Sequence, residues 1–201
     1  MEVLFVTSNA NKVKNAEAAL RYFGISVKQV NIALMESRSE DPTEIALEKA
    51  RQAFRQLGRP VLVEDSGFFI AASGGFPMTH IKFSLNTLGV EKVLKTLEGE
   101  NNRQAEWRMT AAYVWGTDTY KTFTFVEKGE ITTELRPVRR PVMSEYWRIF
   151  VPKILPDNQL ALSELDDRAL ADWQSYYQKH NQFAQLGEWL SQQQSNGATT
   201  K

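Results

Sequence analysis

The residues best suited to chemistry are two adjacent acids, Glu64 and Asp65, which follow the β-forming run Val61-Leu62-Val63 and precede Ser66 and Gly67. A buried strand that ends in carboxylates would deliver them to one edge of a sheet, and in open α/β sheets that edge binds ligands. Neighbouring carboxylates repel each other unless water, a base or a metal ion neutralises them. The same residues are also common in turns, so the stretch alone fits either a ligand site or a solvated surface turn.

Lysines from three segments could supply the cations for such a site. The polar turn from Thr7 to Lys12 joins a short apolar strand to a helix predicted over residues 11–23, and a helix start with a lysine suits phosphate. The glycines of a P-loop are absent, so a plain turn with a surface lysine also fits. Lys49 lies on the apolar face of a helix predicted from Pro42 to Leu57, where a lysine either extends outward or points at an anion. Lys82 opens a further helical segment.

Composition narrows the chemistry of this chain. Lys+Arg and Asp+Glu both number 24, so the zero net charge argues against a dedicated nucleic-acid-binding protein. The absence of cysteine and the presence of only two histidines, His80 and His180, argue against thiolate or histidine-rich zinc sites. A metal would therefore be a hard cation on oxygen ligands, Mg²⁺ before Ca²⁺. Carboxylates with lysines indicate Mg²⁺-dependent chemistry on phosphates, in which a carboxylate orients or deprotonates a water molecule.

The remaining elements indicate an α/β protein with an antiparallel addition. A second strand is predicted over residues 25–32, a hairpin over residues 103–126 and a helix from Leu160 to Leu190. We expect a single domain of two lobes over residues 1–191 and a disordered tail over residues 192–201. The N-terminus has no basic start, and its apolar run is too short for a signal peptide or a membrane span, so we expect a cytoplasmic protein without a membrane partner.

The segment from Leu135 to Pro156 is rich in arginine, proline and aromatic residues. It fits either a surface loop or a lid whose aromatics, including Tyr146 and Trp147, stack on a base while its arginines meet phosphate.

Several motifs in register give a more specific indication than any single motif. They include Thr7-Ser8-Asn9-Ala10-Asn11-Lys12, Glu36 in an acidic loop, Glu44-Ile45-Ala46-Leu47-Glu48-Lys49-Ala50, Pro60-Val61-Leu62-Val63-Glu64-Asp65-Ser66-Gly67, Gly74-Gly75-Phe76-Pro77 and Ile81-Lys82. In order and spacing this first half of the chain resembles the inosine triphosphate pyrophosphatase (Ham1-like) family, which acts on non-standard purine nucleoside triphosphates.

The resemblance implies a mixed, twisted sheet in two lobes with a central cleft and helices on its faces, the Maf/Ham1 fold, usually as a homodimer. The implied reaction is the Mg²⁺-dependent hydrolysis of a nucleoside triphosphate to monophosphate and pyrophosphate. By position, the metal ligands would be Glu36, Glu64 and Asp65, and the catalytic residues would be Asp65 as the base, Glu64 and Lys12. The implied substrate-binding residues are Thr7, Ser8, Asn9, Lys12, Lys49, Ser66 and Lys82, together with Tyr146, Trp147 and His180.

The second half departs from the family pattern where the base is bound. The family has Pro-Arg-Gly and then Phe-Gly-(Trp/Tyr)-Asp-Pro, whereas this chain has Arg139-Arg140-Pro141 and then residues 144–150, with Arg148 near the missing aspartate. The family's Ser-His-Arg corresponds at best to Lys179-His180-Asn181. Three hypotheses follow: a pyrophosphatase for inosine- or xanthosine-type triphosphates, a pyrophosphatase with altered base specificity, or a nucleotide-binding protein that has lost catalysis.

Overall fold

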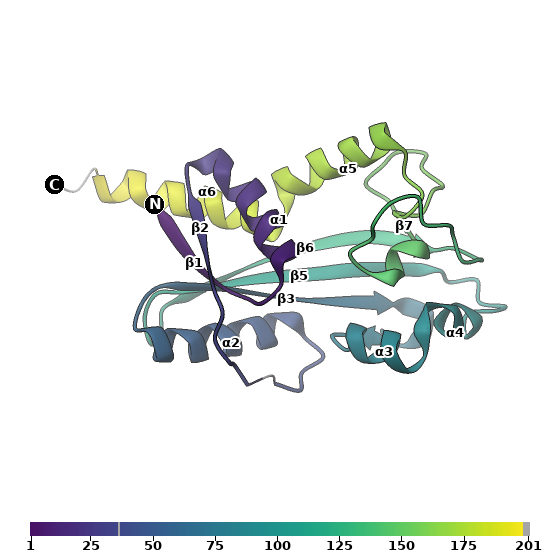
Figure 1. Cartoon of the computed structure of the whole chain (residues 1–201), viewed down its shortest axis with the longest axis horizontal. Coiled ribbons are helices and arrows are strands. Elements are labelled where there is room, and N and C mark those ends of the chain that lie inside the picture. Colours follow the sequence, from purple (N-terminus) through teal and green to yellow (C-terminus); the bar gives the residue numbers. More distant parts are fainter. Residues whose placement is uncertain (36, 199–201) are drawn as a thin grey trace. The chain divides into compact units, whose positions relative to one another are not determined.

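A computed structural model describes residues 1–35 and 37–198, with the backbone alone for residues 196–198 (Figure 1). The strands are β1 (Glu2–Val6), β2 (Ser26–Val30), β3 (Val61–Ile70), β4 (Pro77–Met78), β5 (Gln104–Val114), β6 (Tyr120–Ile131) and β7 (Phe150–Pro152). The α-helices are α1 (Ala10–Leu20), α2 (Pro42–Leu57), α3 (Ile81–Thr87), α4 (Gly89–Lys95), α5 (Asp167–His180) and α6 (Gln182–Ala198). Short 3₁₀ turns are η1 (Arg21–Phe23), η2 (Ala71–Ser73) and η3 (Glu145–Arg148).

The strands form a mixed sheet in the order β2-β1-β3-β5-β6-β7, with β4 paired to β3. β1 is parallel to both β2 and β3, and its register with β3 joins Leu4 to Val61 and Phe5 to Leu62. The pairs β3–β4 and β6–β7 are antiparallel. The predicted mixed α/β fold with helices on the faces of the sheet is therefore confirmed.

The chain divides into two compact units. The first contains residues 1–65, 109–125 and the C-terminal residues from Tyr177, and the second contains residues 66–108 and 126–176. The predicted cleft between two lobes stays a prediction.

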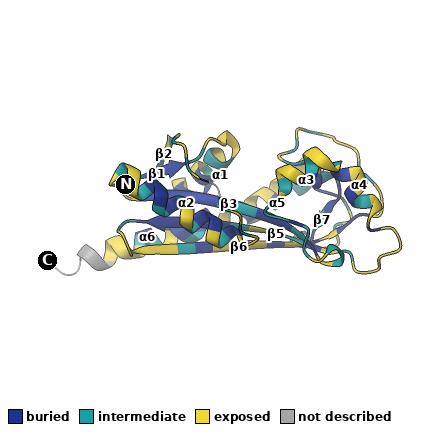
Figure 2. Cartoon of the chain, turned by 90° about the horizontal axis from the view of Figure 1, so that it is seen from below, coloured by how far each residue is buried: buried dark blue, intermediate teal, exposed yellow. Residues whose placement is uncertain are grey.

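Helices cover both faces of the strands in the first unit (Figure 1). On one face, residues of α1 and α6 pack with Leu62 and Phe5, and the Phe5 ring meets that of Phe183 edge-on. On the other face, alanines of α2 pack with Val61 and Val63. Figure 2 shows the corresponding pattern, buried strands beneath helices with exposed outer surfaces. The alternation of side chains along β3 explains how one strand contributes to two cores.

The helix ends differ in detail from the sequence expectation. The side chain of Asn9 accepts hydrogen bonds from the backbone N–H groups of Asn11 and Lys12, and so caps α1. The predicted helix over residues 11–23 ends at Leu20, and η1 carries the chain to Gly24, whose φ of 66° favours glycine. Asp41 caps α2, since its carboxylate accepts from the backbone N–H of Thr43.

The single C-terminal helix expected from Leu160 to Leu190 is two helices, and neither begins before Asp167. They are separated at Asn181, whose buried side-chain oxygen accepts from the N–H groups of Phe183 and Ala184 and starts α6. Residues 192–198, expected in a disordered tail, continue α6, because glutamine is a reasonable helix former. None of the described helices is long and apolar enough to cross a membrane.

The second unit is built around the fully buried Phe68 ring. Its centroid lies 4.5 Å from that of Trp107, 4.7 Å from that of Tyr146 and 5.6 Å from that of Phe150. These residues come from β3, β5, η3 and β7, so a single cluster packs the strands against the segment from Leu135 to Pro156, which we expected to be a surface loop or a lid.

A buried acid in this second unit predicts a pH-dependent stability. Glu127 on β6 is 2% exposed and accepts a hydrogen bond from the indole of Trp173 on α5. Burial raises the pKa of this carboxyl from 4.5 to about 7, although the indole hydrogen bond acts in the opposite direction. The folded state therefore holds this proton more tightly than the unfolded state, and the associated stability is lost as the pH rises from about 4.5 through about 7.

We expect Glu127→Gln to remove this dependence, because glutamine keeps an acceptor for Trp173 and cannot ionise. The gap between 4.5 and about 7 corresponds to roughly 3 kcal/mol, so the variant should exceed the wild type at pH 8 by up to that amount and match it at pH 4.5. Urea unfolding across this range measures the difference, with Glu130→Gln on the exposed side of the same strand as control. Parallel stability curves for wild type and Glu127→Gln would contradict the prediction.

Candidate active site

Glu64 and Asp65 lie within β3 and not at its end, which corrects the sequence expectation. β3 runs on through Gly67 to Ile70, because β-forming apolar residues follow the acids. A Cβ on Gly67 would lie 2.6 Å from the Phe69 ring, so this glycine permits close packing and does not make a turn. The acids nevertheless lie where β3 extends beyond its neighbour β1. The register of the two strands joins Phe5 to Leu62, and β1 ends at Val6, so β1 does not reach Glu64 and Asp65.

Each acid meets a lysine from the helix that covers its own face of the strand. The Lys12 ammonium, on α1, lies 2.5 Å from Oε2 of Glu64 and donates a hydrogen bond of 3.2 Å to the Glu64 carbonyl. The Lys49 ammonium, on α2, donates a hydrogen bond of 2.7 Å to Oδ2 of Asp65. Successive side chains of a strand point to opposite faces, so Glu64 shares the α1 side with Leu62 and Asp65 shares the α2 side with Val63.

The two pairs form one electrostatic group. Burial raises the pKa of the Glu64 carboxyl, and the neighbouring Lys12 offsets this only in part. For Lys12, burial alone would lower the ammonium pKa, but the charges of Glu64 and Asp65 outweigh it and raise the pKa. Lys12 therefore stays cationic, and the group of two ammonium groups and two carboxyl groups can hold anions and cations alike.

Two of the three predicted metal ligands lie in this group, and their chemistry fits a hard divalent cation. Oε2 of Glu64 is buried, and beyond its ion pair it accepts no hydrogen bond within the described chain. Over the described residues there is no group of three or more His, Cys, Asp or Glu side chains that could hold a metal, and the predicted ligand Glu36 lies outside them.

The turn before α1 presents polar groups next to Lys12. Thr7 Oγ1 accepts from the backbone N–H of Asn9, and the N–H of Thr7 donates to the carbonyl of Val30. Asn9 uses its side-chain oxygen as the helix cap, and Ser8 is exposed. The start of α1 therefore has an ordered polar turn in which Asn9 orients the first N–H groups of the helix.

The acidic loop is anchored to α2 by a residue that the sequence reasoning missed. Gln52 accepts a hydrogen bond of 2.9 Å from the N–H of Met35 and donates one of 3.1 Å to its carbonyl. Gln52 lies three residues after Lys49 on the same helix and is buried. A buried glutamine on an otherwise apolar helix face was the available signal, because such amides need partners.

The predicted base-stacking residues do not lie at a surface. Tyr146 is fully buried in the second unit, where its hydroxyl shares a hydrogen bond of 2.9 Å with Ser84. Trp147 is also buried and packs edge-on against Trp173. Their aromatic rings fill the core of this unit, so stacking on a base would require them to leave it.

The other predicted substrate-binding residues are distributed over both units. Ser66 follows Asp65 directly in β3, and Lys82 is exposed in the first turn of α3, both in the second unit. His180 is exposed at the end of α5 in the first unit, where its carbonyl accepts from Gln185.

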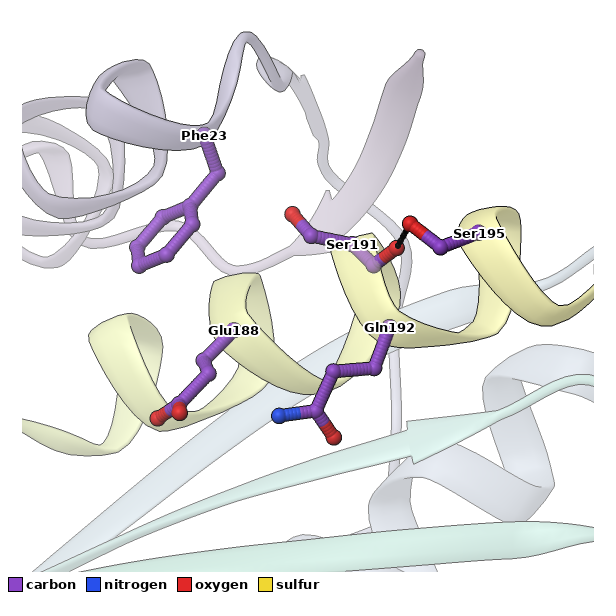
Figure 3. A pocket seen from close by; sticks show the side chains of 5 residues that line it. All are labelled: Phe23, Glu188, Ser191, Gln192 and Ser195. Carbon is purple, nitrogen blue, oxygen red and sulfur yellow. Dashed lines mark hydrogen bonds between the residues drawn. The ribbon is translucent and has the colours of Figure 1, made fainter.

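A cavity of about 500 Å³ in the first unit lies between η1 and α6, and its lining contains none of these charged residues (Figure 3). Its lining residues are Phe23, Glu188, Ser191, Gln192 and Ser195. The single charged side chain of this lining, that of Glu188, is acidic, so the lining offers no cation to a polyphosphate.

Comparison with known proteins identifies relatives over most of the chain. The model of a family described as the Ham1 family matches residues 3–173. A dITP/XTP pyrophosphatase of Methanopyrus kandleri is 41% identical over 136 residues, which cover 68% of this chain and 72% of that protein. An inosine triphosphate pyrophosphatase of Saccharomyces cerevisiae is 31% identical over 199 residues, 95% of this chain and 96% of that one. A solved structure of a HAM1 protein from Coxiella burnetii superimposes with a TM-score of 0.72 and 25% identity, over 98% of this chain and 99% of that one.

Proposed function

Because this chain belongs to the Ham1 family, we propose that it is a nucleoside triphosphate pyrophosphatase, which hydrolyses its substrate to a nucleoside monophosphate and pyrophosphate. The observation that carries the proposal is the pairing of Lys12 with Glu64 and of Lys49 with Asp65 across the two faces of β3. Such a group offers cations to phosphate oxygens and carboxylates to a metal ion or a water molecule.

In the proposed mechanism the chain holds the triphosphate through ammonium groups. Lys12 and Lys49 exchange their carboxylate partners for phosphate oxygens, and charge-assisted hydrogen bonds of this kind are about twice as strong as neutral ones. The turn of Thr7, Ser8 and Asn9 orients the start of α1 toward the same anion, and Ser66 and Lys82 contribute further polar contacts. Pyrophosphate is a good leaving group, so the barrier is lowered mainly by positioning and by charge neutralisation.

Asp65 is the proposed catalytic base. Its carboxylate orients a water molecule toward the phosphorus that is attacked and accepts the proton as the P–O bond forms. Glu36, Glu64 and Asp65 are the proposed ligands of Mg²⁺, and the bound ion would neutralise charge on the phosphate oxygens. The anchoring of Met35 on Gln52, close in sequence to Lys49, supports a role for the acidic loop in this site.

The proposed substrate is a non-standard purine nucleoside triphosphate such as ITP, XTP or dITP, in line with the names of the relatives. The burial of Tyr146 and Trp147 favours a second candidate, a pyrophosphatase whose base contacts differ from the family pattern. We also propose, from the family resemblance, that the protein is a cytoplasmic homodimer. Light scattering during size-exclusion chromatography tests the oligomeric state.

A panel of nucleoside triphosphates tests the reaction and the substrate together. We expect pyrophosphate release with Mg²⁺ and no release without it, and a higher kcat/KM for ITP, XTP or dITP than for the four ordinary ribonucleotides. Preference for another base would support the second candidate. Nucleotide binding without pyrophosphate release from any substrate would show instead a protein that binds nucleotides and has lost catalysis.

A further inference from the structure

Two lysine–carboxylate ion pairs lie at β3, and ligands that bind to these side chains must separate them. Lys12 lies 2.5 Å from a Glu64 oxygen, and Lys49 lies 2.7 Å from an Asp65 oxygen. The Glu64 side chain is 3% exposed and that of Lys12 is 26% exposed, while both side chains of the other pair are about 15% exposed. Water therefore screens these contacts poorly, and separating either pair is costly.

Each proposed phosphate ligand is thus paired with a proposed metal ligand. A divalent cation that binds alone must draw Glu64 or Asp65 away from an ammonium group and then remain close to that like charge. A polyphosphate that binds alone must draw Lys12 or Lys49 from a carboxylate and remain close to that carboxylate. Either ligand alone separates an ion pair that water screens poorly, and this separation is the costly step.

When both ligands are present, each separated charge faces a ligand of the opposite sign. The carboxylates then face the cation, the ammonium groups face the polyphosphate, and the two ligands also attract each other. The free-energy cost of separating the two ion pairs arises only once, although both ligands bind. Ligands that share such a cost bind with positive coupling, which is reciprocal by thermodynamic necessity.

We infer that the ion pairs Lys12–Glu64 and Lys49–Asp65 act as a double latch, which couples divalent-cation binding to polyphosphate binding so that neither binds well alone. This inference rests on the proposed function for the identity of the ligands. It adds a property that the reaction does not require, since metal and phosphate could also bind independently. The latch would keep the site from being filled by free phosphate or free cation.

Calorimetry on the whole protein tests the latch. It measures the affinity for Mg²⁺ alone, for inorganic pyrophosphate alone, and for each probe in the presence of the other. Free concentrations are corrected for the complex that the probes form in solution. For the wild type we expect each probe to tighten the binding of the other by about 5- to 150-fold, the usual range of coupling between sites.

Two variants each remove one ion pair, and each should change the binding of the two probes in opposite directions. In Lys12→Met and Lys49→Met a carboxylate loses its ammonium partner, so Mg²⁺ alone should bind at least about 5-fold more tightly, while pyrophosphate alone should bind more weakly and the coupling should shrink. The control is Lys14→Met, an exposed lysine on α1, which removes the same unit of charge without breaking either pair. Circular dichroism establishes that each variant is folded.

The measurements decide the inference without relying on turnover. If both variants bind Mg²⁺ no more tightly than Lys14→Met, or if the wild type binds the two probes independently, the latch is overturned while the pyrophosphatase proposal stands. If one variant alone shows tighter Mg²⁺ binding, the latch holds at that pair and is overturned at the other. If the coupling is present but no nucleotide of the panel is hydrolysed, the reaction fails and the latch stands.

Discussion

Asp65→Asn is expected to lower kcat for pyrophosphate release by about 10²- to 10⁴-fold, the range that a positioned acid or base contributes. The amide has nearly the shape of the carboxylate but cannot accept the proton of the attacking water. Because the side chain already lies against the Lys49 ammonium, the asparagine can keep a hydrogen-bonded place in β3. Steady-state release of pyrophosphate from the best nucleotide of the panel is the measurement.

The fold should survive this substitution. Asp65→Asn removes the negative charge of a pair that water screens poorly, so we expect it to lower the free energy of unfolding by about 1–3 kcal/mol, as for Lys12→Met. Asp118→Asn, in the exposed turn between β5 and β6, is the matched control and should leave kcat unaltered. Wild-type turnover in folded Asp65→Asn would remove this residue from the role of base.

Lys12→Met is expected to raise KM for the nucleoside triphosphate by about 10- to 100-fold, which corresponds to the loss of one charge-assisted hydrogen bond. The methionine keeps most of the aliphatic chain of Lys12, a residue in the first turn of α1. The change should also destabilise the protein by about 1–3 kcal/mol, because Glu64 loses its partner in a buried position. Partial exposure of Lys12 makes this smaller than for a fully buried pair.

The changes in KM and in stability are compared with those of Lys14→Met, which removes the same charge from the exposed side of α1. Kinetics at a fixed Mg²⁺ concentration give KM and kcat, and urea unfolding gives the stability. If KM and kcat of Lys12→Met equal those of Lys14→Met, the turn before α1 is not a phosphate site. A loss of stability alone would leave Lys12 with a purely structural role.

Much of the first unit could be predicted because its signals are local. The alternation of apolar residues and helix caps such as Asp41 depends on neighbours in the sequence, so β1, β2, α1 and α2 were all expected close to their observed ranges. The order and spacing of the motifs indicated the family as well as the local structure, because several short motifs at fixed spacing are far more specific than any single one. The tail after Gln192 could not be judged in this way, since polar residues suit both a helix and a coil.

The second unit was less predictable because its organisation depends on long-range packing. Tyr146 and Trp147 have side chains that suit both a base platform and a core, and their sequence neighbours do not decide between the two. What decides is the aromatic cluster around Phe68, a residue almost eighty positions earlier, together with Trp173 on α5. Glu127 was equally hidden, because an alternating strand gives no sign that one of its acids faces a tryptophan from a later helix.

The sequence by itself determined the kinds of groups at the site: two adjacent carboxylates, lysines on two predicted helices, and no cysteine and few histidines to suggest another chemistry. It could not determine how these charges are paired. Adjacent acids in a strand must leave opposite faces, and which cation each one meets depends on which helix packs on that face. Only the tertiary structure, with α1 on one side of β3 and α2 on the other, decided that Lys12 neutralises Glu64 and that Lys49 neutralises Asp65.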